Sequence, residues 1–189
     1  MAAFFDVMGW ASVEGNEAVE VTTVGLQPEV RCSFGLRVRP DRLIDEVKPE
    51  RFDALALPGG FEEHGYYEDA YSEPVLCLIR RFENRPIASI CVGALPLARS
   101  GVLKGRSATT YHLGGSVRRQ QLAGMGIRVL DQAIVQDGNI TTSTGPATAI
   151  LVALELLARL TSPENADHVR HMMGFEPELP PRHHSGIKT

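Results

Sequence analysis

The chain has 189 residues, of which 43% are hydrophobic and 22% are charged, and its formal net charge is −4 at pH 7. A chain of this length and apolar content is typical of one globular domain. The acidic balance and the lack of any cluster of lysines and arginines argue against a nucleic-acid partner. No apolar stretch approaches the roughly 20 residues that a bilayer-spanning helix needs, and no N-terminal signal pattern is present. The sequence therefore predicts a cytoplasmic protein without a membrane partner.

The three cysteines, Cys32, Cys77 and Cys91, are odd in number and widely spaced. This pattern favours neither a disulfide framework nor a zinc site, and it indicates a reducing compartment. Cys77 lies in an apolar stretch with helical spacing, where we expect a small buried hydrophobic side chain. We predict no metal and no cofactor.

Short strands alternate with helices along the whole chain, which is typical of a parallel α/β sandwich. In the first half of the chain, the expected elements are a helix over 2–11, a strand over 19–24, a helical turn over 40–46, a strand over 52–57, a helix over 74–83 and a strand over 87–90. The second half is expected to contain a helix ending at Arg99, a strand over 107–110, a helix over 120–125 and strands over 128–130, 133–135 and 140–143. A helix over 147–160 and a last helix from Ser162 follow. We expect one domain over residues 1–177 and a disordered tail over 178–189.

The most informative feature is the stretch from Ile87 to Gly93. An apolar run of four residues after Arg85-Pro86 predicts a buried strand, and Cys91 follows it directly. Gly93 then permits a sharp turn into a helix, so the pattern is that of a nucleophile elbow. Because this turn lies at a helix N-terminus, we expect a lowered thiol pKa at Cys91.

A second strand end completes the expected site. The apolar run over 52–57 ends in Pro58-Gly59-Gly60, whose backbone N–H groups are free to bind an anion. Carboxyl ends of parallel strands meet at one edge of a sheet, so Cys91 and these glycines should share a crevice. We predict an oxyanion hole made by the amides of Gly60 and Val92.

Three strings, ALALPGGFEE, PIASICVGALPLARSGVLKGRSATTYH and DGNITTSTGPATA, resemble the ThiJ/PfpI superfamily, which includes the parkinsonism-associated deglycase. The resemblance extends from about Val19 to Phe175. It implies a class I glutamine amidotransferase-like fold, that is, a three-layer α/β/α sandwich with a mainly parallel, flavodoxin-like sheet. It also implies a homodimer and a reactive elbow cysteine, held by a glutamate from the first strand-to-helix loop and often accompanied by a histidine.

His112 is the best candidate for the general base, because imidazole titrates near neutral pH and can take a thiol proton. In several relatives a histidine directly follows paired threonines, whereas this chain has Tyr111 there and His112 one residue later. One residue along a strand reverses the face, so Tyr111 could occupy the substrate pocket in place of His112. The backbone of Gly145, at another strand end, is expected to line the pocket. The loop residues Glu62 to His64 fit a solvated charged segment better than a ligand-binding one.

This chain differs from the family pattern at two places, and each difference changes what we expect of its activity or its sheet. Relatives that act as intracellular proteases have a histidine after the cysteine, and this chain has Val92. The helix over 2–11 corresponds to the one that follows the first strand in relatives. We therefore expect a sheet without that central strand or its glutamate, with a gap between the segments 19–24 and 54–57.

These observations predict a cysteine-dependent hydrolase or lyase acting on a small-molecule electrophile such as a carbonyl, an amide or an isocyanide (glyoxalase, amidase or isocyanide hydratase-like chemistry). The alternative is a redox-responsive, stress-protective protein whose Cys91 is oxidised without turnover. A third hypothesis, the ligand-binding module of a transcription regulator, ranks last because no helix-turn-helix pattern follows the domain.

Overall fold

The computed structural model describes residues 1–175, so the predicted tail over 178–189 lies outside the described residues. The helices are α1 (Ala2–Glu14), α2 (Tyr66–Ala70), α3 (Glu73–Arg80), α4 (Ala94–Ser100), α5 (Arg118–Gly124), α6 (Ala149–Leu160) and α7 (Pro163–Met172). The strands are β1 (Val24–Gly25), β2 (Val30–Arg31), β3 (Arg37–Val38), β4 (Arg42–Leu43), β5 (Leu55–Leu57), β6 (Ile87–Ile90), β7 (Ser107–Ala108), β8 (Arg128–Val129), β9 (Ile134–Asp137) and β10 (Ile140–Ser143). Within this part of the chain no helix is long and apolar enough to cross a membrane.

The main sheet has the strand order β5-β6-β10-β9. Strand β6 pairs in parallel with both β5 and β10, and β9 runs antiparallel to β10. Gly138 turns the chain between β9 and β10 with φ 62°, a conformation that glycine adopts without a side-chain clash. Since β5, β6 and β10 point the same way, the loops that follow them emerge at one edge of the sheet, as predicted.

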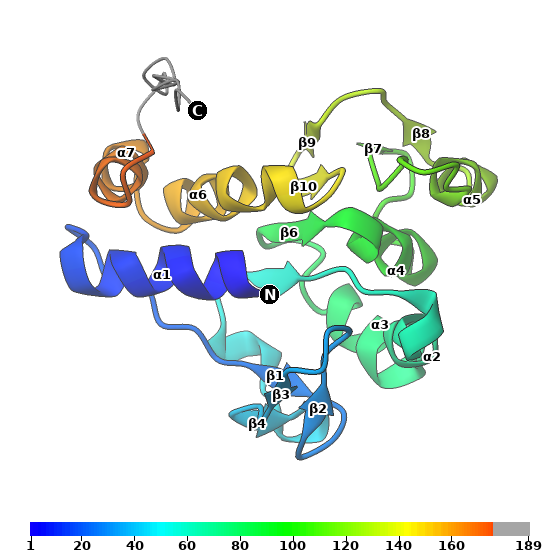
Figure 1. Ribbon diagram of the computed structural model, residues 1–189, viewed down its shortest axis with the longest axis horizontal. Helices are drawn as coiled ribbons and strands as arrows, with labels where there is room; N and C mark the ends of the chain where they lie inside the picture. Colours follow the sequence, from blue (N-terminus) through cyan, green and yellow to red (C-terminus); the bar gives the residue numbers. More distant parts are fainter. Residues whose placement is uncertain (176–189) are drawn as a thin grey trace, which may run out of the picture.

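Helices cover both faces of this sheet, so the architecture is the predicted three-layer α/β/α sandwich with a mainly parallel, flavodoxin-like sheet (Figure 1). Strand β6 alternates between the two layers, because its side chains point to opposite faces in turn. Ile87 packs with α3, α4 and α5, whereas Ala88 and Ile90 pack with α1, α6 and α7. Every residue of β6 is buried, which explains its continuous apolar pattern.

The strand expected over 19–24 is wrong in extent. Only Val24 and Gly25 form a strand, and they pair with β4 outside the main sheet. An apolar cavity of about 600 Å³ separates the segment 19–27 from Ala54–Pro58, and residues of α1 and α3 also line it. Strand β5 is consequently an edge strand of the sheet. A strand needs a hydrogen-bonding neighbour, and no described residue occupies the place between 19–24 and β5.

Candidate functional site

Cys91 has φ 61°, and within residues 1–175 it is the one non-glycine residue with a positive φ. Such a conformation is strained for a residue with a Cβ and is typical of functional sites. Cys91 directly follows β6 and is the first residue of the 3₁₀ turn Cys91–Gly93, which leads into α4. This is the backbone geometry of a nucleophile elbow.

Two glycines make room for the elbow. A Cβ on Gly93 would come within 2.8 Å of the Leu57 carbonyl oxygen, and a Cβ on Gly59 would come within 2.8 Å of the Cys91 Cβ. The hydroxyl of Thr110 donates a hydrogen bond to the Cys91 carbonyl at 2.9 Å and fixes the turn from the other side. The strained conformation is therefore held by contacts from the ends of β5 and β7.

The thiol of Cys91 is half-buried, and burial raises its pKa above the ordinary value. A hydrogen bond from the Val92 amide and the positive charge of Arg118 act in the opposite direction. Burial disfavours the charged thiolate, and here it outweighs both stabilising effects. The expected lowering of the pKa by the helix N-terminus is not what the structure shows. No carboxylate of the described residues hydrogen-bonds the thiol.

The two predicted oxyanion donors have different surroundings. The Val92 amide is directed at Cys91, while Gly60 packs against the ring of Tyr66, whose Cδ2 lies 2.3 Å from where a Cβ would stand on that glycine. The Tyr66 hydroxyl donates to the Pro58 carbonyl at 2.9 Å and fixes the segment Pro58-Gly59-Gly60. Burial raises the pKa of Tyr66, so this donor stays protonated.

Tyr111, predicted to line the pocket, and His112, predicted as the base, differ in their surroundings. Tyr111 packs against the same apolar cluster as Cys91, and its Cδ2 lies 3.5 Å from the Cβ position of Gly145. The Nδ1 atom of His112 is buried and has no hydrogen-bond partner in the part of the chain that the structure describes. The structure thus brings Tyr111 and Gly145 together at the cysteine end of the sheet, and it leaves a ring nitrogen of His112 free for a partner.

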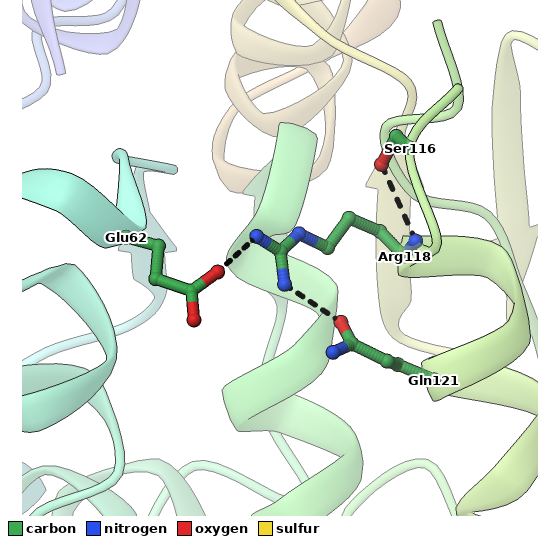
Figure 2. Close-up of polar contacts among 4 residues, drawn as sticks. All are labelled: Glu62, Ser116, Arg118 and Gln121. Carbon is green, nitrogen blue, oxygen red and sulfur yellow. Dashed lines mark hydrogen bonds and ion pairs between the residues drawn. The ribbon is translucent and has the colours of Figure 1, made fainter. Parts of the chain in front are cut away.

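Arg118 is a site residue that the sequence did not single out. Its side chain extends from α5 to Glu62, in the loop after Gly60, and it also contacts Gln121 (Figure 2). The guanidinium carbon lies 4.9 Å from the centre of the Tyr67 ring. Residues 62 and 118 are 56 positions apart and belong to no local motif, so only tertiary structure reveals this contact.

The other cysteines differ from expectation in one respect. Cys32 is half-buried, but Cys77 is exposed, so its prediction as a buried residue is wrong. In α3 the buried face is formed by Leu76 and Ile79, and Cys77 points away from it. Helical spacing identifies the apolar face of a helix, but it does not decide whether a small residue beside that face is buried or exposed.

We expect the alkylation rate of Cys91 to keep rising with pH beyond the range of an exposed thiol. The thiolate reacts, and burial raises the pKa of Cys91, so the thiolate fraction near neutral pH is small. Site-resolved mass spectrometry after labelling with iodoacetamide at a series of pH values gives the profile, with exposed Cys77 as the internal reference. A Cys91 profile with its midpoint below that of Cys77 would contradict the effect of burial.

The fold and this geometry define an α/β protein with a cysteine nucleophile elbow at the carboxyl end of its sheet. The model of the DJ-1/PfpI family matches residues 5–159, and the chain therefore belongs to that family. The fruit fly protein dj-1beta (Drosophila melanogaster) is 34% identical over 163 residues, which cover 84% of each chain. Deglycase PfpI of Pyrococcus furiosus is 37% identical over 114 residues, covering 59% of this chain and 64% of the relative. The crystal structure of Drosophila DJ-1beta superposes with a TM-score of 0.78 at 31% identity, over 91% of this chain and 88% of that one.

Proposed function

We propose that this protein is a cysteine-dependent enzyme that acts on a small electrophile, with Cys91 as the nucleophile. The observation that carries the proposal is the strained backbone of Cys91, at φ 61°, held against Gly59 beside a directed Val92 amide. Strain of this kind persists only where surrounding contacts impose it. The relative from P. furiosus is named a deglycase, which supports carbonyl chemistry for this chain.

In the proposed first step, the Cys91 thiol gives up its proton and the sulfur bonds to a carbonyl carbon of the substrate. The π electrons of that carbonyl move to its oxygen, and the amides of Val92 and Gly60 stabilise the resulting negative charge. Tyr111 or His112 transfers the proton from the thiol to this oxygen, so that the adduct is neutral. With an amide substrate, the adduct collapses to a thioester and expels the amine, which takes the proton from the oxygen. With a 2-oxoaldehyde, the hydrogen on the carbon bonded to sulfur moves to the neighbouring carbonyl carbon, and the adduct becomes the thioester of a 2-hydroxy acid. In both cases water hydrolyses the thioester to the carboxylic acid and restores the thiol of Cys91.

Turnover assays with the purified protein test this function. We expect one of three substrate classes, 2-oxoaldehydes, amides or isocyanides, to be consumed catalytically, with many product molecules formed per protein chain. Product detection by NMR or mass spectrometry identifies the reaction. Stoichiometric labelling of Cys91 without turnover by any of the three classes would contradict the enzymatic proposal.

The second candidate is a redox-responsive, stress-protective protein. It uses the same thiolate of Cys91, which hydrogen peroxide oxidises and which the Val92 amide stabilises by a hydrogen bond. The Val92 amide beside the sulfur is also a suitable donor to a sulfinate oxygen. In this function, hydrogen peroxide adds one or two oxygen atoms to Cys91 and to neither of the other cysteines, as seen in peptide masses.

We also propose that the protein forms a homodimer in the cytoplasm and has no metal. The support for a dimer is an apolar surface at the tip of the β2–β3 hairpin, where Phe34 is 89% exposed and Leu36 is 62% exposed. Large exposed apolar side chains that lie close together mark interaction surfaces. Phe34 also contacts Phe61 at 5.5 Å between ring centres, so this surface adjoins the loop that holds Glu62.

A further inference from the structure

The ion pair between Arg118 and Glu62 joins α5 to the segment that follows β5. The Nη2 atom of Arg118 lies 2.6 Å from Oε2 of Glu62, and Nη1 donates to Oε1 of Gln121 at 2.9 Å (Figure 2). Glu62 is three residues after Gly59, which lies directly against Cys91. The guanidinium is therefore held beside the loop that contacts the nucleophile.

The two partners of this ion pair are fixed to different degrees. The Arg118 side chain is 18% exposed and lies over the ring of Tyr67, which packs against the same apolar cluster as Cys91. The Glu62 side chain is 66% exposed. The arginine is consequently the fixed partner, and the glutamate is the one that can leave for solvent.

A carboxylate on a ligand would make the same contact that Glu62 makes. Exposed ion pairs contribute only about 0–1 kcal/mol, so exchange of one carboxylate for another costs little. The guanidinium presents several N–H donors in one plane, which match two carboxylate oxygens at once. The Tyr67 hydroxyl, buried and without a partner among the described residues, is a further donor beside that position.

The charge of Arg118 also reaches the nucleophile. Burial raises the pKa of Cys91, Tyr67 and Tyr71, and the charge of Arg118 opposes this rise at all three groups. A positive charge that acts on the sulfur also attracts an anionic electrophile to it. Apart from Cys91, the titratable groups that interact with the Arg118 charge are Glu62, Tyr67 and Tyr71. The two tyrosines are neutral near pH 7.

We propose that Arg118 is a specificity residue that selects electrophiles carrying a carboxylate, such as 2-oxo acids. Glu62 occupies the carboxylate position until the ligand displaces it. This inference rests on the proposed function, since it assigns a substrate class to the same cysteine.

Two alkylating reagents of nearly equal size test the inference, because iodoacetate carries a carboxylate where iodoacetamide carries a neutral amide. The measured quantity is the ratio of their rates at Cys91, in a background with Cys32→Ser and Cys77→Ser. Because both reagents react with the same thiolate, the ratio of their rates does not depend on the thiolate fraction of Cys91. We expect Arg118→Gln to lower the iodoacetate to iodoacetamide ratio roughly threefold or more, and Glu62→Gln to raise it. Arg118→Lys should retain part of the preference.

Arg119→Gln is the matched control, because Arg119 is the next residue and pairs with Asp131 at 2.7 Å. It should leave the ratio unchanged. An unchanged ratio in Arg118→Gln, or an equal fall in Arg119→Gln, would overturn the assignment.

A binding measurement tests the role of Arg118 without any reaction at the thiol. Oxamate, an unreactive 2-oxo acid analogue, should bind Cys91→Ser and lose at least about tenfold in affinity when Arg118→Gln is added, by titration calorimetry. Equal binding by both variants would overturn the role of Arg118. A Cys91 that resists both alkylating reagents would instead remove the proposed function, and the oxamate result would still stand for Arg118.

Discussion

Cys91→Ser should abolish turnover and leave the fold nearly unchanged. Serine is close in size to cysteine but a far weaker nucleophile without a strong base, so the rate should fall by roughly three orders of magnitude or more. The half-buried side chain loses little packing, so the free energy of unfolding should change by less than about 1 kcal/mol. Steady-state kinetics and urea unfolding measure the two effects.

The base variants are the comparison for this experiment. His112→Ala and Tyr111→Phe should each reduce the rate less than Cys91→Ser, because each is one of two candidates for the proton transfer. A rate in Cys91→Ser close to that of the parent would show that the nucleophile lies elsewhere. If His112→Ala is as inactive as Cys91→Ser, His112 is the base and Tyr111 is not.

Gly59→Ala should destabilise the protein by about 1–3 kcal/mol and slow the labelling of Cys91. The new methyl group would come within 2.8 Å of the Cys91 Cβ, 3.0 Å of the Ile90 carbonyl oxygen and 3.2 Å of the Val92 nitrogen. Backbone atoms of a buried strand do not move easily, so the elbow itself must shift. Urea unfolding and iodoacetamide labelling report the two consequences.

Gly9→Ala is the control for this substitution. Gly9 lies within α1, and a Cβ there has no atom within 4 Å. Alanine is the better helix former by up to about 1 kcal/mol, so this variant should be as stable as the parent or more stable. Equal stabilities of Gly59→Ala and Gly9→Ala would mean that the close approach at Cys91 is not rigid.

The elbow could be predicted from the sequence because its determinants are local. A four-residue buried strand, a cysteine and Gly93 follow one another without interruption, and the structure has them as β6 and the turn into α4. The hairpin at Gly138 is local in the same way. The segment 19–24 was mispredicted because strand formation depends on a neighbouring strand, which a hydrophobic pattern does not supply.

The electrostatics of the site were less predictable than its backbone. Placement of Cys91 near a helix start suggested a lowered pKa, but α4 has seven residues and the thiol is half-buried. Burial depends on side chains from several elements, among them Tyr66 and Tyr67. The contribution of Arg118 was likewise invisible, because an ion pair across 56 residues leaves no local signature.

The apolar cavity beside β5 has a consequence for the nucleophile. Among residues 1–175, strand β5 pairs with β6 alone, and it leads directly into Pro58 and Gly59, beside the elbow. Edge strands accept an additional strand readily, whatever molecule provides it. An extended apolar segment pairing with this edge would restrict the motion of Gly59 relative to Cys91. The short stretch from Leu55 to Gly59 would connect such pairing at the edge to the position of the Cys91 sulfur.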